Sequence, residues 1–404
     1  MAADRVTLLI DPPNAPGHGR MWSHLASDTS YDELHRFAQA LGVPQRGFDR
    51  DHYDIPAERY DAVVAAGAVP VSSRQLIERL RTAGLRRRKA DALAPKRPGN
   101  ALVRARRLRP GDRVAVVAPS GPVPEDLLDA GVSVLRSWGL EVTEAEHVRG
   151  GDAPLGYLAA DDAARADDLM RAWVDPRVAA VFCARGGYGA QRVLDLLDWR
   201  TLALAVPKVL VGFSDLTALH QAFAARLGLS TLHGPVLASL ASGDDESREH
   251  LRSLLFSASP GLTLTSASGH TLWPGRAEGA LVGGNLALLA SGVGTHGSLA
   301  ATGSIAVLED VGAEPFRIDR QLTQLLRAGW FDGVRGIVLG QFTDCGPPER
   351  VRQLLTDRLV PLAVPTLSGA PFGHEPRNLA FPYGVPAVLD ADAGTLVLRE
   401  APLL

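Results

Sequence analysis

The sequence predicts an α/β protein with a parallel, doubly wound sheet domain, a smaller β-rich α/β domain after it and a small α/β module before it. Between residues 113 and 213, short apolar runs typical of strands alternate with segments of helical periodicity. Strands that alternate with helices form a parallel sheet covered on both faces, and ligands bind at the carboxyl ends of such strands. The length of 404 residues allows two or three domains, each with its own core.

The small α/β module is expected over residues 1–85. Its predicted elements are a strand at 6–10, an amphipathic helix at 31–41, a strand-rich segment at 62–71 and a helix at 74–80. Residues 86–107 follow as a basic stretch with few large apolar side chains. Such a stretch cannot build a core, so we expect a solvated linker, with an anion-binding patch as the alternative.

Two further domains are expected after the linker, over residues 108–240 and 270–404. The first has predicted strands at 113–118, 141–144, 178–184 and 209–213, and predicted helices at 125–138, 161–173 and 189–197. The second has predicted strands at 305–308 and 336–340, and predicted helices at 286–290, 317–326 and 350–359.

Composition restricts the class of protein. With 46% hydrophobic residues, 22% charged residues and a net charge of -3, the chain shows no sign of disorder or of nucleic-acid binding. The apolar stretch 6–10 is too short for a secretory signal, and no eighteen apolar residues are consecutive, so we expect a cytoplasmic protein without a membrane partner. Cys183 and Cys345 accompany apolar strand-like runs and are expected to be buried thiols.

Ser214 is the first candidate for chemistry, because the apolar strand 209–213 runs directly into a helix there. A serine at such a turn exposes its hydroxyl above the sheet, beside free helix N–H groups. The alternative is a serine that only caps the helix, with Asp215 in its first turn. A nucleophile would need a base and a carboxylate, for which His374 in a polar loop and Glu309 after a strand are candidates.

Two glycine-rich segments could allow a close approach of the backbone. The turn 186–189 could present bare N–H groups, so that Gly187 and Asp215 would form an oxyanion hole. Its glycine spacing fits neither G-x-G-x-x-G nor G-x-x-x-x-G-K-[ST], which disfavours nucleotide binding. Asn285 follows two glycines, where it would either orient substrate or cap the helix 286–290.

Taken together, these motifs resemble the LD-carboxypeptidases, a serine peptidase family that also includes microcin-immunity peptidases. The resemblance covers about residues 108–404, with the motifs in family order. They are VAVVAPSG at 114–121, RGGYG at 185–189, GFSDLT at 212–217, GALVGGNL at 279–286, LEDVGAEPFRIDR at 308–320 and FGHE at 372–375.

The resemblance implies a Ser-Glu-His triad in which Ser214 is the nucleophile, Glu309 the acid and His374 the general base, without a metal or another cofactor. Glu314 is a competitor for the carboxylate, but Glu309 has the motif's position directly after the strand. The family's oxyanion hole falls on the same Gly187 and Asp215 N–H groups. A homodimer is a further expectation from the family.

The resemblance also implies a substrate, because these enzymes remove the terminal D-alanine from murein tetrapeptides in cytoplasmic cell-wall recycling. Arg185 could bind the free carboxylate of this small peptide. The alternatives are a microcin-immunity-like peptidase that acts on peptidyl-nucleotide conjugates, and a binding protein without turnover. An α/β-hydrolase esterase is disfavoured, because that fold carries Gly where Leu216 stands here.

The first ninety or so residues lie outside this resemblance and are similar to a small bacterial domain of unknown function. Asp11, His18, His24 and Asp28 could surround a metal ion or a phosphate. Packing of polar loops is the favoured interpretation, because no spacing typical of metal ligands is present.

Overall fold

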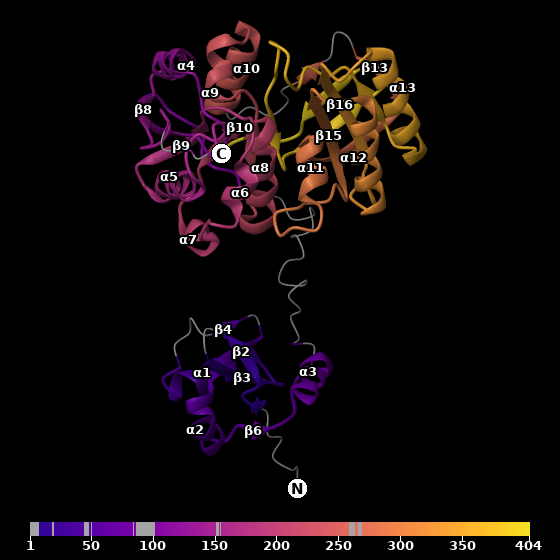
Figure 1. The fold of residues 1–404 in the computed structure, drawn as a ribbon. Coiled ribbons are helices and arrows are strands. Elements are labelled where there is room, and N and C mark those ends of the chain that lie inside the picture. The colour runs from indigo at the N-terminus through magenta and orange to yellow at the C-terminus, as the bar shows by residue number, and fades with distance from the viewer. Residues whose placement is uncertain are drawn as a thin grey trace. The chain divides into compact units, whose positions relative to one another are not determined.

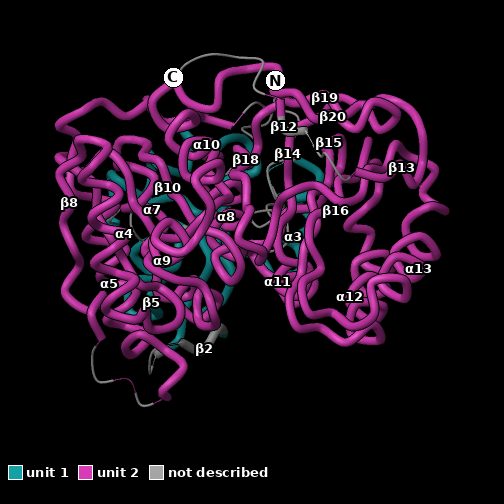
Figure 2. The backbone as a smooth tube through the Cα atoms, turned by 90° about the horizontal axis from the view of Figure 1, so that it is seen from above, with its two compact units in different colours: residues 1–94 teal, residues 95–404 magenta. Residues whose placement is uncertain are grey.

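The computed structural model describes residues 8–17, 20–43, 48–49, 51–83, 85, 102–150, 153, 155–257, 263–265 and 269–404. The chain forms two compact units, residues 1–94 and residues 95–404, which Figure 2 distinguishes by colour. Each unit has its own sheet structure and its own buried apolar clusters (Figure 1).

The first unit is built on a six-stranded sheet. Five of its strands have the order β4-β5-β3-β1-β6, and the sixth, β2, pairs with β3. Leu9 and Ile10 are neighbours in β1 and point to opposite faces, as alternation in a strand requires. Ile10 packs with α1 and α2, and Leu9 packs with α3. The elements are β1 Leu8–Ile10, β2 Ala15–Gly17, β3 Arg20–Ser27, α1 Tyr31–Ala40, β4 Phe48–Asp49, β5 His52–Pro56, α2 Tyr60–Ala65, β6 Val69–Pro70 and α3 Ser73–Thr82.

The strand-rich prediction for residues 62–71 is wrong in its first half. Helix α2 covers residues up to Ala65, and only Val69–Pro70 form a strand. The run Ala62–Ala66 is short and apolar, and a run of this kind does not distinguish a buried strand from a helix. The predicted helix at 31–41 and the predicted helix at 74–80 are confirmed as α1 and α3.

The second unit contains two sheets, and the first confirms the predicted doubly wound architecture. Its order is β18-β11-β10-β9-β7-β8, with all pairs parallel except that of β18 with β11. Val114 and Val116 of β7 pack with α4 on one face, whereas Ala115 and Val117 pack with α5 on the other. The elements are β7 Arg113–Val117, α4 Glu125–Ser137, β8 Glu141–Glu144, α5 Asp162–Val174, β9 Val178–Cys183, α6 Ala190–Leu194, α7 Trp199–Leu204, β10 Val209–Gly212, α8 Thr217–Ala222, β11 Thr231–His233, α9 Leu237–Ser242, α10 Asp245–Phe256 and β18 Phe381–Tyr383.

The second sheet is mixed and has eight strands in the order β12-β20-β19-β14-β15-β16-β17-β13. Its central strands β14, β15, β16 and β17 are parallel to one another, and the outer pairs are antiparallel. The elements are β12 Thr263–Thr265, β13 His270–Trp273, β14 Arg276–Asn285, α11 Leu286–Gly292, β15 Ser304–Val311, α12 Pro315–Arg327, β16 Gly336–Thr343, α13 Pro348–Leu359, β17 Thr366–Ser368, β19 Pro386–Asp390 and β20 Thr395–Leu398.

The predicted division into residues 108–240 and 270–404 does not describe the sheets completely. Strand β18 comes from the C-terminal part of the chain but forms the edge of the first sheet, where Leu232 faces Pro382. One buried apolar cluster also joins both sheets. The two predicted domains are therefore packed as one compact unit.

The predicted linker 86–107 extends too far at its C-terminal end. Residues 86–101 lie outside the described residues, but residues 102–107 pack on the second unit. Val103 pairs with Leu229, Ala105 is 2% exposed, and the Arg107 N–H donates to the Leu404 carbonyl at 2.7 Å. Small apolar side chains between the arginines are sufficient to hold this segment against the core.

The cysteine prediction is confirmed, because Cys183 and Cys345 are both buried free thiols. Among the residues that the structure describes, no helix has the length and apolar character needed to cross a membrane.

Candidate active site

Ser214 lies two residues after the end of β10 and begins a short 3₁₀ turn, Ser214–Leu216, that leads into α8. Its φ of +65° is the left-handed conformation that a non-glycine residue seldom adopts, so the turn is strained. The N-cap position falls on Phe213, whose side chain has no hydrogen-bonding group. The helix-cap interpretation of Ser214 is therefore wrong, and its hydroxyl is available for another partner.

That partner is His374. Its Nε2 lies 2.9 Å from Ser214 Oγ, and its Nδ1 lies 2.8 Å from Glu309 Oε2. A carboxylate accepts hydrogen bonds only, so Nδ1 carries the ring proton and Nε2 accepts from the Ser214 hydroxyl in the neutral imidazole. The Glu309 side chain is fully buried, and that of His374 is 16% exposed. The structure thus brings the three predicted side chains into one hydrogen-bonded chain.

The three residues come from different elements. Ser214 follows β10 of the first sheet, Glu309 lies in β15 of the second sheet, and His374 lies on the segment between β17 and β18. Because β17 belongs to the second sheet and β18 to the first, the segment that carries His374 crosses from one sheet to the other. Glu314, the competing carboxylate, is instead exposed just before α12.

The two sheets approach closely beside this site, at Gly284. A Cβ atom added there would lie 2.5 Å from Thr217 Oγ1 and 3.1 Å from His233 Nε2, and its φ of +123° also favours glycine. The next residue, Asn285, donates its backbone N–H to Thr217 Oγ1 at 3.0 Å. The glycines before Asn285 therefore allow the strands to approach one another.

Asn285 caps a helix, which is one of its two predicted roles. Its Oδ1 accepts from the Leu288 N–H at 3.3 Å, and its Nδ2 donates to Asp310 Oδ1 at 3.2 Å. Burial raises the pKa of Asp310 to about 6, and the negative charge of Glu309 acts in the same direction. Both polar groups of the Asn285 side chain are thus used within the protein, so its role in substrate binding stays a prediction.

The glycine turn after β9 packs against Ser214. A Cβ atom added to Gly186 would lie 3.2 Å from Ser214 Oγ. The Gly186 carbonyl accepts from the Gly121 N–H at 3.1 Å, so the N–H of Gly187, in the same trans peptide, points the opposite way. Gly187 has a φ of +104°. This geometry is compatible with the oxyanion-hole prediction for Gly187, which no contact in the structure tests.

The Asp215 side chain has a structural role. Its carboxylate is buried and accepts from Ser120 Oγ at 2.5 Å and from the Ala190 N–H at 2.7 Å. It therefore joins the loops that follow β7, β9 and β10. Burial raises the pKa of this carboxyl. The predicted oxyanion-hole donor is its backbone N–H, and that assignment stays a prediction.

Two buried histidines near the site were not identified from the sequence. His220 of α8 lies with Nε2 2.7 Å from the Gly212 carbonyl and Nδ1 2.8 Å from Thr231 Oγ1, and burial lowers its pKa to about 4. His233 stacks on Phe381 at 4.5 Å, and burial lowers its pKa too. Their apolar sequence surroundings indicate core positions, which is where they lie.

Arg185, the predicted carboxylate partner, is exposed at the end of β9. Its Nη1 donates to the Pro122 carbonyl at 2.8 Å. Tyr188 follows in the same turn, and its ring lies 5.7 Å from that of Tyr157, with about half of each side chain exposed. The structure shows no contact that assigns a ligand to Arg185.

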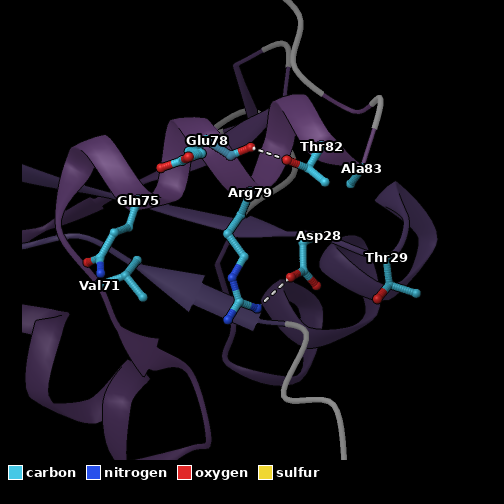
Figure 3. Close-up of a pocket in the computed structure, with 8 residues that line it drawn as sticks. All are labelled: Asp28, Thr29, Val71, Gln75, Glu78, Arg79, Thr82 and Ala83. Atoms are coloured by element: carbon cyan, nitrogen blue, oxygen red, sulfur yellow. Dashed lines mark hydrogen bonds and ion pairs between the residues drawn. The ribbon is translucent and has the colours of Figure 1, made fainter.

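The first unit brings together only part of its predicted group. Asp11 contacts His24 at 3.0 Å, whereas Asp28 pairs with Arg79 at 2.8 Å, and His18 lies outside the described residues. The Asp28–Arg79 pair lies in a pocket of about 730 Å³ on α3 (Figure 3). The pocket is lined by Asp28, Thr29, Val71, Gln75, Glu78, Arg79, Thr82 and Ala83.

Within the second unit, the arrangement of alcohol, imidazole and buried carboxylate on a parallel α/β scaffold is typical of serine hydrolases. Family models give the more specific assignment. Residues 114–234 match the LD-carboxypeptidase N-terminal domain, and residues 278–389 match the LD-carboxypeptidase C-terminal domain. A putative carboxypeptidase of Streptomyces coelicolor is 56% identical over 304 residues, which cover 75% of this chain and 98% of that protein. The chain belongs to the LD-carboxypeptidase family and is a serine carboxypeptidase.

Other relatives agree with this assignment. The murein tetrapeptide carboxypeptidase of Pseudomonas aeruginosa is 39% identical, with 69% of this chain and 94% of that protein covered. The crystal structure of muramoyltetrapeptide carboxypeptidase from Oxalobacter formigenes has a TM-score of 0.62 at 30% identity, over 71% of this chain and 97% of that one. A MccF-like protein from Bacillus anthracis has a TM-score of 0.67 at 25% identity, over 73% of this chain and 99% of that one.

The first unit matches a different family. Residues 8–83 match a model described as a protein of unknown function, DUF4031. The chain thus joins a serine carboxypeptidase to a second module for which the match gives no activity.

Proposed function

We propose that this carboxypeptidase removes the terminal D-alanine from murein tetrapeptides during peptidoglycan recycling in the cytoplasm. The observation that carries the proposal is the chain of hydrogen bonds from Glu309 through His374 to Ser214, in a member of a family whose relatives include a murein tetrapeptide carboxypeptidase. The substrate is a small peptide, and the family resemblance adds the expectation of a homodimer.

In the proposed mechanism, Ser214 Oγ attacks the carbonyl carbon of the scissile amide while its proton passes to His374 Nε2. Glu309 keeps the ring in the required tautomer and stabilises the imidazolium. The negative oxygen of the tetrahedral intermediate accepts from the N–H groups of Gly187 and Asp215.

The second half of the reaction uses the same base. The amine of D-alanine takes the proton from His374 and leaves, so an acyl-enzyme remains on Ser214. His374 then activates a water molecule that releases the shortened peptide. This chain's own side chains and N–H groups supply each step, so the proposal includes no cofactor.

Arg185 is proposed to bind the free carboxylate of the substrate. It lies two residues after β9 ends and two residues before Gly187, and one of its nitrogens donates to the Pro122 carbonyl while the guanidinium remains exposed. A guanidinium has five N–H donors, so the remaining ones are sufficient for a bidentate contact.

The direct test is mass spectrometry of the products that the purified full-length protein forms from a defined set of muropeptides. The proposal predicts loss of one alanine from tetrapeptides, and no product with the Ser214→Ala variant. A peptidyl-nucleotide conjugate is the competing substrate, because MccF-like structures share this fold. Cleavage of that conjugate, with tetrapeptides left intact, would favour the microcin-immunity alternative.

A further inference from the structure

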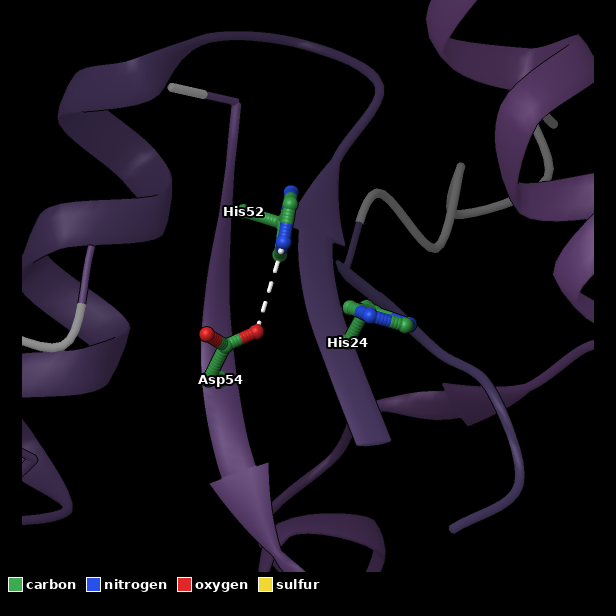
Figure 4. Close-up of side chains that lie close together, drawn as sticks. All are labelled: His24, His52 and Asp54. Carbon is green, nitrogen blue, oxygen red and sulfur yellow. Dashed lines mark ion pairs between the residues drawn. The ribbon is translucent and has the colours of Figure 1, made fainter. Parts of the chain in front are cut away.

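A cluster of His24, His52 and Asp54 in the first unit is not used by the proposed peptidase mechanism (Figure 4). His24 of β3 pairs directly with Asp54 of the antiparallel β5. His52 lies two residues before Asp54 on the same strand, so its side chain is on the same face of the sheet. One ring nitrogen of each histidine and one oxygen of Asp54 all lie within 4.8 Å of one another.

Two buried carboxylates hold these imidazole rings. Asp11, 1% exposed, lies 3.0 Å from His24 Nδ1 and also accepts from Ser73 Oγ at 2.6 Å. Asp51, fully buried, lies 2.7 Å from His52 Nδ1. Histidines that ligate metal ions are commonly oriented in this way by a carboxylate on the other ring nitrogen. His52 consequently presents Nε2 to Asp54, with 3.3 Å between the two atoms.

The distances between the nitrogen and oxygen atoms of His24, His52 and Asp54 suit a cation that forms short bonds to nitrogen and oxygen. Around a tetrahedral Zn²⁺ ion with bonds of about 2.0 to 2.1 Å, neighbouring ligand atoms lie roughly 3.3 to 3.4 Å apart. The pair from His52 and Asp54 already has this separation. The other separations are at most 4.8 Å, and the Asp54 side chain, 44% exposed, has room to rotate toward both imidazoles.

We propose that His24, His52 and Asp54 bind one divalent transition-metal ion of the zinc class, with Asp11 and Asp51 as orienting partners. Two imidazoles and one carboxylate suit Zn²⁺, Co²⁺ or Mn²⁺ better than Ca²⁺ or Mg²⁺, which prefer oxygen ligands alone. Three protein ligands leave at least one coordination position for water or for an oxygen of a second ligand. The site is built from residues of the first unit and shares no residue with the triad.

The test uses full-length protein from which a chelator has removed any bound metal. Co²⁺ is then added in steps, and its binding is measured by visible absorption. We expect one Co²⁺ per chain, displaced by Zn²⁺. The variants His52→Gln and Asp54→Asn are each expected to weaken binding at least 10-fold, and Asp11→Asn by about 10- to 100-fold. Zn²⁺ should also raise the Tm of the wild type, because it binds the folded state.

His147→Gln is the matched control. His147 also pairs with a buried carboxylate, that of Asp168 at 3.1 Å. Among the described residues, however, it does not belong to any cluster of three side chains that could bind a metal ion. Its loss should leave the Co²⁺ affinity unchanged. Circular dichroism shows whether each variant folds. If His52→Gln does not fold, Asp54→Asn still tests the proposal. Equal affinity in wild type and Asp54→Asn, or no Co²⁺ bound by the wild type, would overturn the proposal.

Discussion

The same pair of groups, an imidazole held by a buried carboxylate, occurs in both units of this chain with different third partners. In the second unit, Glu309 holds His374, whose other nitrogen faces the Ser214 hydroxyl. In the first unit, Asp51 holds His52, whose other nitrogen faces the Asp54 carboxylate. An O–H donor at that place favours proton transfer, whereas a second carboxylate favours a cation. The third partner therefore determines the chemistry that the pair supports.

Removal of the Ser214 hydroxyl deprives His374 of the O–H donor that distinguishes the second unit from the first. Ser214→Ala is expected to lower kcat for release of D-alanine by about 10⁴- to 10⁶-fold, because the nucleophile is lost. Liquid chromatography of the released amino acid measures this change. Ser133→Ala, an exposed serine on α4, is the control and should keep wild-type turnover. Near-normal turnover in Ser214→Ala would exclude this residue as the nucleophile.

A second prediction concerns the carboxylate of the triad. Glu309→Gln keeps the size of the side chain but offers an amide in place of a carboxylate, so the ring tautomer and the imidazolium lose their support. We expect kcat to fall by about 10³- to 10⁴-fold. Glu314→Gln should have no comparable effect, since that residue is exposed before α12. Similar losses in the two variants would contradict the assignment of Glu309.

A third prediction concerns substrate binding. If Arg185 binds the terminal carboxylate, Arg185→Ala should lower kcat/KM by about 10- to 100-fold, mostly through KM, since a charged hydrogen bond contributes about 1.5 to 3 kcal/mol. Arg200→Ala, at an exposed position in α7, is the control. Steady-state kinetics with a tetrapeptide and with its C-terminal amide show whether Arg185 acts on the terminal carboxylate. The amide should be a poor substrate for wild type and should respond little to the variant.

A fourth prediction concerns the stability of the fold and a histidine without a carboxylate partner. Burial lowers the pKa of His220 to about 4 from its usual 6.5, so the unfolded chain binds more protons than the folded one between these values. The free energy of unfolding should therefore fall as the pH decreases from about 6.5 to about 4, by about 3 kcal/mol for this group. Urea unfolding at several pH values measures it. In His220→Gln, the free energy of unfolding should decrease less over this pH range. If it decreases as much as in the wild type, other groups cause the loss of stability at low pH.

The sequence was most informative where local patterns decide the structure. The strand run 209–213 followed by Ser214 predicted the turn, and the motif positions singled out Glu309 over Glu314. Alternating strands and helices likewise predicted the parallel first sheet, which the structure confirms.

Other features depend on contacts between distant segments. His52 and Asp54 were overlooked, because only the antiparallel register of β3 and β5 brings them to His24. Strand β18 was assigned to the later domain, since nothing in residues 381–383 reveals that they pair with β11. The packing of residues 102–107 depends in the same way on the chain's last residues.

The segment between β17 and β18 is anchored in both sheets, and His374 lies on it. One sheet alone positions either the nucleophile or the acid. Only the two sheets together position His374 between Ser214 and Glu309. Assembly of the triad therefore requires both sheets of the second unit.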